Sequence, residues 1–369
     1  MNTTASTQRL ASIDALRGFD MLMISGAGSL LVQLGGKTNQ PWVDAVAAQF
    51  EHPAWNGFTF YDFIFPLFLF MAGVSLSFSL NSTRHQALPK TVLYKKACKR
   101  MLILIGLGIL FKNAPLPIFE PGQIRFVSVL GRIGFAGFIT TILYLNFRPR
   151  GRMAWIAGIL LAYYAALYLI PVPGFGAGDL SFEGNLVGWF DRHVLPGRLL
   201  QKTYDELGLL TQLPALCLTM LGAFAGDILR GSGSGGQKLR TLVVLGVGGI
   251  VLGQLWGMHF PINKHLWTSS FILLTGGMAF LALALFYGVI DVWGIRKWAF
   301  VFQVIGMNSL TIYLLNGFVD FKYTSERLFG GIYGQAPETW HVVWQGVGAL
   351  VLVWLFLYFL YRNKLFLKV

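Results

Sequence analysis

Residues 266–290 read LWTSSFILLTGGMAFLALALFYGVI, a stretch without one charged side chain. About 20 consecutive apolar residues are enough for a helix to cross the hydrocarbon core of a bilayer. The composition agrees, because 55 % of the 369 residues are hydrophobic, only 12 % are charged and the mean hydropathy is +0.60. Soluble proteins carry about 25 % charged residues. The sequence therefore excludes an ordinary soluble enzyme and indicates an integral membrane protein.

Other segments of the chain repeat this pattern. Their apolar runs are continuous rather than alternating, which excludes an all-β barrel. We predict an all-α integral membrane protein, a polytopic bundle of about ten transmembrane helices, at roughly 13–34, 58–80, 100–111, 126–146, 153–171, 208–227, 241–258, 266–290, 299–318 and 341–361.

The distribution of lysine and arginine predicts the orientation. One side of the bundle, which includes 84–100, 148–152 and both termini, carries about twice as many of these residues as the other. We therefore expect both termini to be cytoplasmic. The net charge of +13 then reflects topology, and no nucleic-acid partner is expected. We treat the chain as a single domain, with candidate halves 1–230 and 238–369 joined by a Gly/Ser-rich linker.

The loops predicted on the outer side are long and rich in Trp, Pro and Gly, at 35–57, 172–207 and 319–340. Long ordered loops usually carry function, so we expect the chemistry to face outward. The sequence contains no HExxH, no paired CxxC and no GxxxxGK[ST] motif. No metal and no ATP-driven mechanism are therefore expected.

Charged residues inside the spans are costly and point to function or to specific packing. Asp14, Arg17 and Asp20 recur every three residues and share one face of the first span. They could form a self-neutralising ladder that locks helix packing. Alternatively, Arg17 could contact a phosphate near the cytoplasmic end. The spacing alone does not decide between these two interpretations.

Asp62 and Arg132 enter the second and fourth spans from the same side to a similar depth. Their opposite charges predict a buried ion pair. Pro66 follows Asp62 within the same helix and should kink it.

His52 lies directly before a Trp-Asn-Gly turn that leads into the helix of Asp62. An imidazole at the membrane mouth could act as a general base or accept an acyl group. His85, His193, His259, His265 and His341 lie in loops and are expected to be surface or packing residues.

The arrangement HxxWNGxTxxDxxFP, from His52 to Pro66, resembles the heparan-alpha-glucosaminide N-acetyltransferase family of transmembrane acyltransferases. The order of further similar stretches makes the resemblance specific over nearly the whole chain. These stretches are SIDALRGFD at 12–20, VLGRIG at 129–134, YDELGLLTQLPA at 204–215, LGAFAG at 221–226, FPINKHLWTSS at 260–270 and GMNSLTIY at 306–313.

The resemblance implies transfer of an acetyl group from cytoplasmic acetyl-CoA to a glucosamine-like amino sugar on the outer side of a bacterial inner membrane. His52 matches the family's active histidine by its place in HxxWNG. It would take a proton from the amine or hold the acetyl group covalently. The family also uses an asparagine near the outer end of the first span, where Ser25–Leu31 here reads SGAGSLL.

We expect the bulky, anionic donor and the sugar acceptor to meet at His52, in a cavity bordered by the PINKHLWTSS turn. Membrane lipid is a further expected partner, and the chain could pair as a homodimer. The residues expected to bind the acceptor are Trp55, Asn56, Asp62 and Asp20, and those expected to bind acetyl-CoA are Arg17, Arg132, Asn263, Lys264, Trp267, Ser269 and Asn308.

A secondary transporter for a sugar or amino sugar is the alternative function. Many helices, a kinked helix and interior charges also suit a permease. A transporter would place its essential polar groups near the midplane, whereas an acyltransferase needs a base near the outer mouth.

Overall fold

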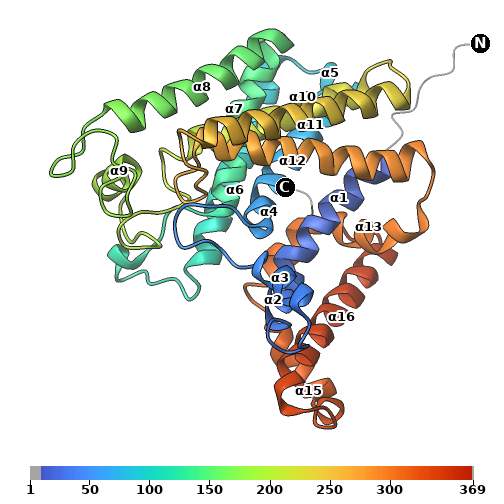
Figure 1. Ribbon diagram of the computed structural model, residues 1–369. Coiled ribbons are helices and arrows are strands. Elements are labelled where there is room, and N and C mark those ends of the chain that lie inside the picture. Colours follow the sequence, from blue (N-terminus) through green and yellow to red (C-terminus); the bar gives the residue numbers. More distant parts are fainter. Residues whose placement is uncertain (1–9, 368–369) are drawn as a thin grey trace, which may run out of the picture. The chain divides into compact units, whose positions relative to one another are not determined.

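The computed structural model describes residues 10–367, which form helices and loops without a β-strand (Figure 1). Within this range, eight helices are long and apolar enough to cross a membrane. A ninth span is formed if the two short helices Lys297–Gly306 and Ser309–Leu315, bent by 59°, count as one. The eight are Ala11–Gln33, Phe60–Leu80, Val129–Asn146, Pro149–Leu169, Gln212–Arg230, Gly235–Gly257, Ser269–Val292 and Glu338–Arg362.

The predicted all-α membrane fold is confirmed, with eight or nine candidate spans where about ten are predicted. The difference is the segment 100–111, which lies in the helix α6 (Lys90–Lys112). The predicted segment is helical, but the helix begins at Lys90, well before residue 100. Its first half carries Lys90, Lys95, Lys96, Lys99 and Arg100, so it is too highly charged to qualify as a span. Arg9 and Lys368, which contributed to the predicted orientation, lie outside the described residues.

The described residues divide into two compact units. Unit 1 comprises 10–53, 59–65 and 282–367, and unit 2 comprises 54–58 and 66–281. The candidate halves 1–230 and 238–369 stay a prediction. The Gly/Ser-rich stretch between those halves is a short turn within unit 2, where Ser234 caps the next helix in a capping box with Gln237.

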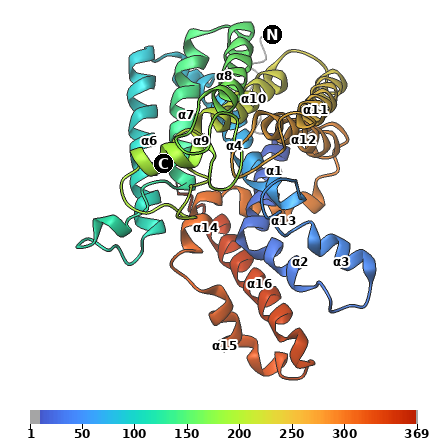
Figure 2. The same ribbon diagram turned by 60° about the vertical axis from the view of Figure 1, so that its left-hand side comes forward.

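Unit 1 combines the beginning and the end of the chain. The helix α1 packs on α13, and the helices α15 and α16 lie side by side (Figures 1 and 2). Its elements are α1 (Ala11–Leu22), the π-helix η1 (Met23–Ala27), α2 (Gly28–Gln33), α3 (Pro41–Ala48), η3 (Gly288–Val292), η4 (Lys297–Ala299), α13 (Phe300–Gly306), α14 (Ser309–Leu315), α15 (Phe321–Tyr333), η5 (Glu338–Trp340) and α16 (His341–Arg362).

Two glycines allow α1 and α13 to pack with their backbones in contact. A Cβ atom added to Gly18 would overlap the Phe302 carbonyl oxygen, and one added to Gly306 would overlap the Asp14 carbonyl oxygen. Small residues at such crossings are typical of helix pairs in membranes, where close backbone approach supplies the attraction.

Unit 2 holds the central part of the chain. The helices α6 and α7 pack side by side, as Figure 2 shows. The helix α10 contacts both α7 and α8. Its elements are most of α4 (Phe60–Leu80), α5 (Thr83–Gln86), α6, η2 (Pro121–Gln123), α7 (Val129–Asn146), α8 (Pro149–Leu169), α9 (Leu186–Val194), α10 (Gln212–Arg230), α11 (Gly235–Gly257) and most of α12 (Ser269–Tyr287).

Candidate active site

His52 and Asp62 form a hydrogen-bonded pair in unit 1. The His52 Nδ1 and Asp62 Oδ1 atoms are 2.6 Å apart. Asp62 lies in the first turn of α4, and its side chain is 1 % exposed, whereas 42 % of the His52 side chain is exposed. A buried carboxylate therefore holds an imidazole that substrate can reach. The sequence marked both residues but did not predict their bond.

The His52–Asp62 pair is fixed by residues of α4 and of the segment that precedes this helix. The backbone N–H of Thr59 donates to the Asp62 Oδ2 atom at 3.1 Å, and the Thr59 hydroxyl donates to the Glu51 carbonyl oxygen at 2.6 Å. An acid that accepts a backbone N–H at the start of a helix also stabilises that helix end. The Tyr61 ring stacks on the imidazole with ring centroids 5.2 Å apart.

This geometry selects the chemistry of the imidazole. When Nδ1 donates its proton to an ionised carboxylate, the lone pair of the ring lies on Nε2. The carboxylate also stabilises the imidazolium that forms when Nε2 takes a proton. The His52–Asp62 pair can therefore serve as a general base or as an activated nucleophile.

Polar side chains continue along the first membrane-spanning helix. Arg17 contacts Asp14 at 3.5 Å. Asp20 is completely buried, and neither of its carboxylate oxygens has a hydrogen-bond partner among residues 10–367. The Ser25 hydroxyl, in the π-helix, is also buried without a partner in this range. Gly28 then lies against the Tyr61 ring. We call the residues Arg17, Asp20, Ser25 and Gly28 the polar track of unit 1. It follows α1 and η1 and ends beside the Tyr61 ring, which stacks on His52.

The break between α13 and α14 holds a second buried polar group of unit 1. Asn308 is the residue between the two helices, whose axes differ by 59°. Its side chain is 2 % exposed, and both amide atoms lack a hydrogen-bond partner in the described part of the chain. A buried amide left in this state is costly, which favours a role in ligand binding.

Unit 1 also contains a cavity of about 500 Å³. Ser25, Gly26 and Ser29 form one wall, and Asn316 and Asp320 belong to the segment that follows α14. Gly26 has φ +136°, a conformation that side chains disfavour, so the helix bulges where it borders the cavity. The segment SGAGSLL, at 25–31, therefore contributes an irregular wall to this cavity.

In unit 2, Asn263 organises the turn before α12. Its Nδ2 donates to the Asn56 Oδ1 atom at 3.0 Å, and its Oδ1 accepts from the Leu266 backbone N–H at 2.8 Å. The Ser269 hydroxyl donates to the Leu160 carbonyl oxygen at 2.7 Å. Asn263 and Ser269 are fully buried. Their side chains thus make structural hydrogen bonds in this state, and Lys264 lies on the same turn.

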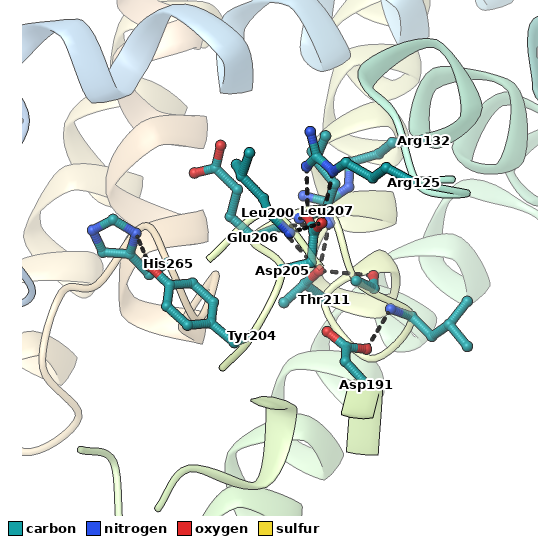
Figure 3. A network of polar contacts seen from close by, with 12 residues as sticks. Arg125, Arg132, Asp191, Leu200, Tyr204, Asp205, Glu206, Leu207, Thr211 and His265 are labelled. Carbon is teal, nitrogen blue, oxygen red and sulfur yellow. Dashed lines mark hydrogen bonds and ion pairs between the residues drawn. The ribbon is translucent and has the colours of Figure 1, made fainter. Parts of the chain in front are cut away.

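Trp55 belongs to an aromatic cluster of unit 2. Its ring is parallel to that of His265, with centroids 5.2 Å apart, and its indole N–H donates to the Leu180 carbonyl oxygen at 2.9 Å. The Tyr204 hydroxyl lies 2.8 Å from the His265 Nδ1 atom (Figure 3). One face of Trp55 is therefore covered by His265, and the Phe182 and Tyr204 rings also contact Trp55 edge to face, with centroids 5.5 Å and 5.3 Å away.

Arg132 lies in a buried polar network (Figure 3). Its guanidinium donates to the Glu206 carbonyl oxygen at 2.9 Å and to the Thr211 hydroxyl, and stacks 4.4 Å from the centre of the Trp267 ring. The structure thus brings together Arg132 and Trp267, two residues predicted to bind the donor. The predicted ion pair between Arg132 and Asp62 stays a prediction, because the two residues belong to different units.

The same network contains acidic residues that the sequence analysis did not single out. Asp205 accepts two hydrogen bonds from Arg125, and Asp191 accepts one from the Leu209 backbone N–H at 3.0 Å. The pKa of Asp191 is raised to about 7, mainly by burial and also by the Asp205 carboxylate, against the lowering effect of the Leu209 hydrogen bond. Asp205 lies in the quoted motif YDELGLLTQLPA, whereas no pattern marked Asp191.

Comparison with known proteins gives two kinds of match. Residues 9–148 match the model of a domain of unknown function, DUF5009. Heparan-alpha-glucosaminide N-acetyltransferase from Mus musculus is 27 % identical over 424 aligned residues, and the enzyme of that name from Homo sapiens is 26 % identical over 430. Each alignment covers 99 % of this chain and 61 % of the relative.

The chain thus spans about three fifths of the length of the curated relatives it matches. The matched part nevertheless extends from one end of the chain to the other, as the ordered motifs predicted. The predicted resemblance is confirmed: the chain is similar over 99 % of its length to heparan-alpha-glucosaminide N-acetyltransferases.

Proposed function

We propose that this protein is a transmembrane acetyltransferase that moves an acetyl group from acetyl-CoA to the amine of a glucosamine-like sugar. The observation that carries the proposal is the His52–Asp62 pair, an accessible imidazole oriented by a buried carboxylate. The named activity of the relatives supports the reaction class. We further propose that the protein lies in a bacterial inner membrane, with the donor on the cytoplasmic side and the acceptor on the outer side.

The polar track of unit 1 suits acetyl-CoA as the donor substrate. Arg17 would contact its phosphates, as an arginine does in many phosphate sites. Asp20, Ser25 and Asn308 have buried polar atoms without partners in the described chain, and the amides and hydroxyl of a pantetheine arm could satisfy them. At 1.5 Å per residue, the track from Arg17 to Gly28 extends roughly 16 Å, a length suited to an extended arm.

The reaction at His52 can follow two routes. In direct transfer, the neutral amine attacks the thioester carbonyl carbon, the C–S bond breaks, and Nε2 takes the amine proton that CoA thiolate finally receives. In the covalent route, Nε2 itself attacks the carbonyl carbon and the C–S bond breaks to release CoA thiolate. The amine then attacks the acetyl-imidazole, its bond to Nε2 breaks, and Nε2 takes the amine proton that the thiolate finally receives. Asp62 stabilises the positive charge of the imidazole in both routes.

The acceptor would lie on the outer side of His52. Trp55 and Asn56 follow His52 within four residues, so the chain itself keeps them near the imidazole. Trp55 would contact the sugar with the part of its ring that its aromatic neighbours leave exposed, and Asn56 would bind a hydroxyl group. We retain Arg132, Asn263, Lys264, Trp267 and Ser269 as proposed donor contacts.

The test compares two histidine variants of the purified protein. His52→Ala should abolish acetyl transfer from labelled acetyl-CoA to glucosamine, while leaving the Kd for acetyl-CoA within about twofold. His193→Ala is the matched control, because His193 is an exposed histidine of α9 whose ring contacts Trp189 of the same helix. Undiminished transfer by His52→Ala would refute the assigned role.

A secondary transporter is a second candidate, favoured by the broken span at Asn308. Transporters commonly place substrate at discontinuous helices. This function predicts saturable uptake of labelled glucosamine by proteoliposomes without acetyl-CoA, and loss of uptake in Asn308→Ala. The acetyltransferase predicts that labelled product forms only when acetyl-CoA is supplied, so the two outcomes are distinguishable.

A further inference from the structure

We propose that a slot in unit 2, between α4, α6 and α7, binds an anionic phospholipid. The phosphate group would lie against Lys96 and Arg100, and the upper part of one acyl chain would fill the slot. The test of this proposal does not depend on acetyl-transfer activity.

The slot is a cavity of about 270 Å³ with apolar walls. Leu76 comes from α4, Leu93 from α6, and Ile133 and Phe138 from α7. Gly137 of α7 also lines the slot, and a Cβ atom added there would meet nothing within 4 Å. A cavity of this volume with apolar walls accepts the upper part of a hydrocarbon chain.

The rim of the slot is basic. Lys96 and Arg100 are exposed and lie one turn apart on α6, and His85 lies on the short helix α5. The Nδ1 atom of His85 is 2.8 Å from the Ser79 carbonyl oxygen, which fixes the ring at the end of α4. No Asp or Glu lines this cavity. The charge is therefore complementary to a phosphate.

The slot lies on a helix whose first half is unusually basic. Lys90, Lys95, Lys96, Lys99 and Arg100 all belong to α6, and this half contains no acidic residue. Basic pockets between transmembrane helices, next to clusters of Lys and Arg, are typical binding sites of anionic lipid headgroups. Two independent features, the open apolar cavity and the charge cluster, thus favour the same ligand.

The lining favours a lipid chain over the pantetheine arm of CoA, which also carries phosphates. A pantetheine arm needs partners for its amides, but the Thr141 hydroxyl already donates to the Gly137 carbonyl oxygen at 2.7 Å. The Ser79 hydroxyl lies 3.3 Å from the His85 Nδ1 atom. An acyl chain needs no such partners, and a slot this small is below the usual ligand-site volume of roughly 300 to 1,000 Å³.

The experiment measures lipid binding by native mass spectrometry of the full-length protein released from neutral detergent. Dioleoylphosphatidylglycerol is the probe, and dioleoylphosphatidylcholine has the same chains without the net charge. We expect one phosphatidylglycerol to bind more tightly than phosphatidylcholine. The double variant Lys96→Gln/Arg100→Gln should weaken that binding about tenfold or more.

Two matched controls separate a site from general surface charge. Lys95→Gln/Lys99→Gln removes the same charge from α6 outside the slot and should change the Kd less than about threefold. Gly137→Leu fills the slot and should also weaken binding, whereas Gly158→Leu, at an equally open position of α8, should not. If the Arg100 change alters thermal unfolding without lipid, Lys96→Gln alone replaces the double variant.

Three outcomes would overturn the proposal. Equal losses in the two charge variants would reduce it to nonspecific attraction. Unchanged phosphatidylglycerol binding in Gly137→Leu would remove the acyl chain from the slot. Binding of CoA or inorganic phosphate that depends on Lys96 and Arg100, with lipid binding unaffected, would assign the site to a soluble anion. Acetyl transfer is not measured, so these outcomes leave the proposed function to its own test.

Discussion

Arg125 holds Asp205 through two parallel hydrogen bonds, from Nε to Oδ2 at 2.7 Å and from Nη2 to Oδ1 at 2.6 Å (Figure 3). Both side chains are buried, with exposed fractions of 4 % and 0 %. The Leu200 and Leu207 backbone N–H groups also donate to this carboxylate. One ion pair therefore ties the segment before α7 to the loop that precedes α10.

Removal of one member of this pair should destabilise the protein strongly. Arg125→Met leaves the Asp205 carboxylate buried without its cation, at a cost of about 3–5 kcal/mol in the free energy of unfolding. The double variant Arg125→Met/Asp205→Leu should lose less than the single variant. Thermal unfolding in detergent measures the stability of both variants. A double variant that is less stable than Arg125→Met would contradict this account.

The close approach of α1 and α13 predicts the effect of a single methyl group. Gly306→Ala places a Cβ atom into the Asp14 carbonyl oxygen, so the helices must separate, at a cost of about 1–3 kcal/mol. Gly331→Ala is the control, because an added Cβ in α15 meets nothing within 4 Å. Equal unfolding temperatures for the two variants would show that the helices do not pack this closely.

The raised pKa of Asp191 predicts a stability that depends on pH. Burial raises this pKa to about 7, whereas the unfolded chain has the ordinary value near 4. Between these pH values Asp191 is protonated in the folded protein but ionised in the unfolded chain. The free energy of unfolding therefore falls as pH rises through this range, and it levels off above about pH 7. Asp191→Asn should flatten this dependence. The measurement is the unfolding temperature of the unmodified protein and of Asp191→Asn from pH 5 to 8. Parallel curves for the two proteins would refute the assignment of this pH dependence to Asp191.

The carboxylate behind His52 should affect catalysis more than binding. Asp62→Asn keeps the size of the side chain but removes the charge that stabilises the imidazolium, and it can favour the wrong ring tautomer. We expect kcat for acetyl transfer to fall by about 10²–10⁴-fold with little change in the Kd for acetyl-CoA. A raised Kd with unchanged kcat would instead make Asp62 a binding residue.

The spans could be predicted because membrane insertion depends on a local property, the hydropathy of about 20 residues. The α6 helix shows the limit of that reasoning. Its apolar half predicted a span at 100–111, but helix formation continues through Lys90 to Arg100, since lysine and arginine favour helix as well as leucine does.

The candidate site could be predicted only in part, because side-chain partners depend on contacts distant in sequence. His52 and Asp62 were both identified, but their hydrogen bond was not. Helical periodicity relates only residues of the same helix, and His52 lies before the start of α4. The Arg125–Asp205 bond joins loops 80 positions apart and leaves no local pattern. The bulge at Gly26 was also hidden, since SGAGSLL is compatible with a regular helix.

The composition of unit 1 has a consequence for synthesis of the chain. Gly18 is made early, whereas its contacts Phe302 and Gly306 emerge only near the end. At about 5–20 residues per second, translation separates these events by roughly 15 to 60 s. During that interval α1, with its buried Asp20, must reside in the membrane or the insertion machinery without α13. The central unit can assemble before α13 is made, so the ribosome delivers the C-terminal end of the chain to a partly built protein.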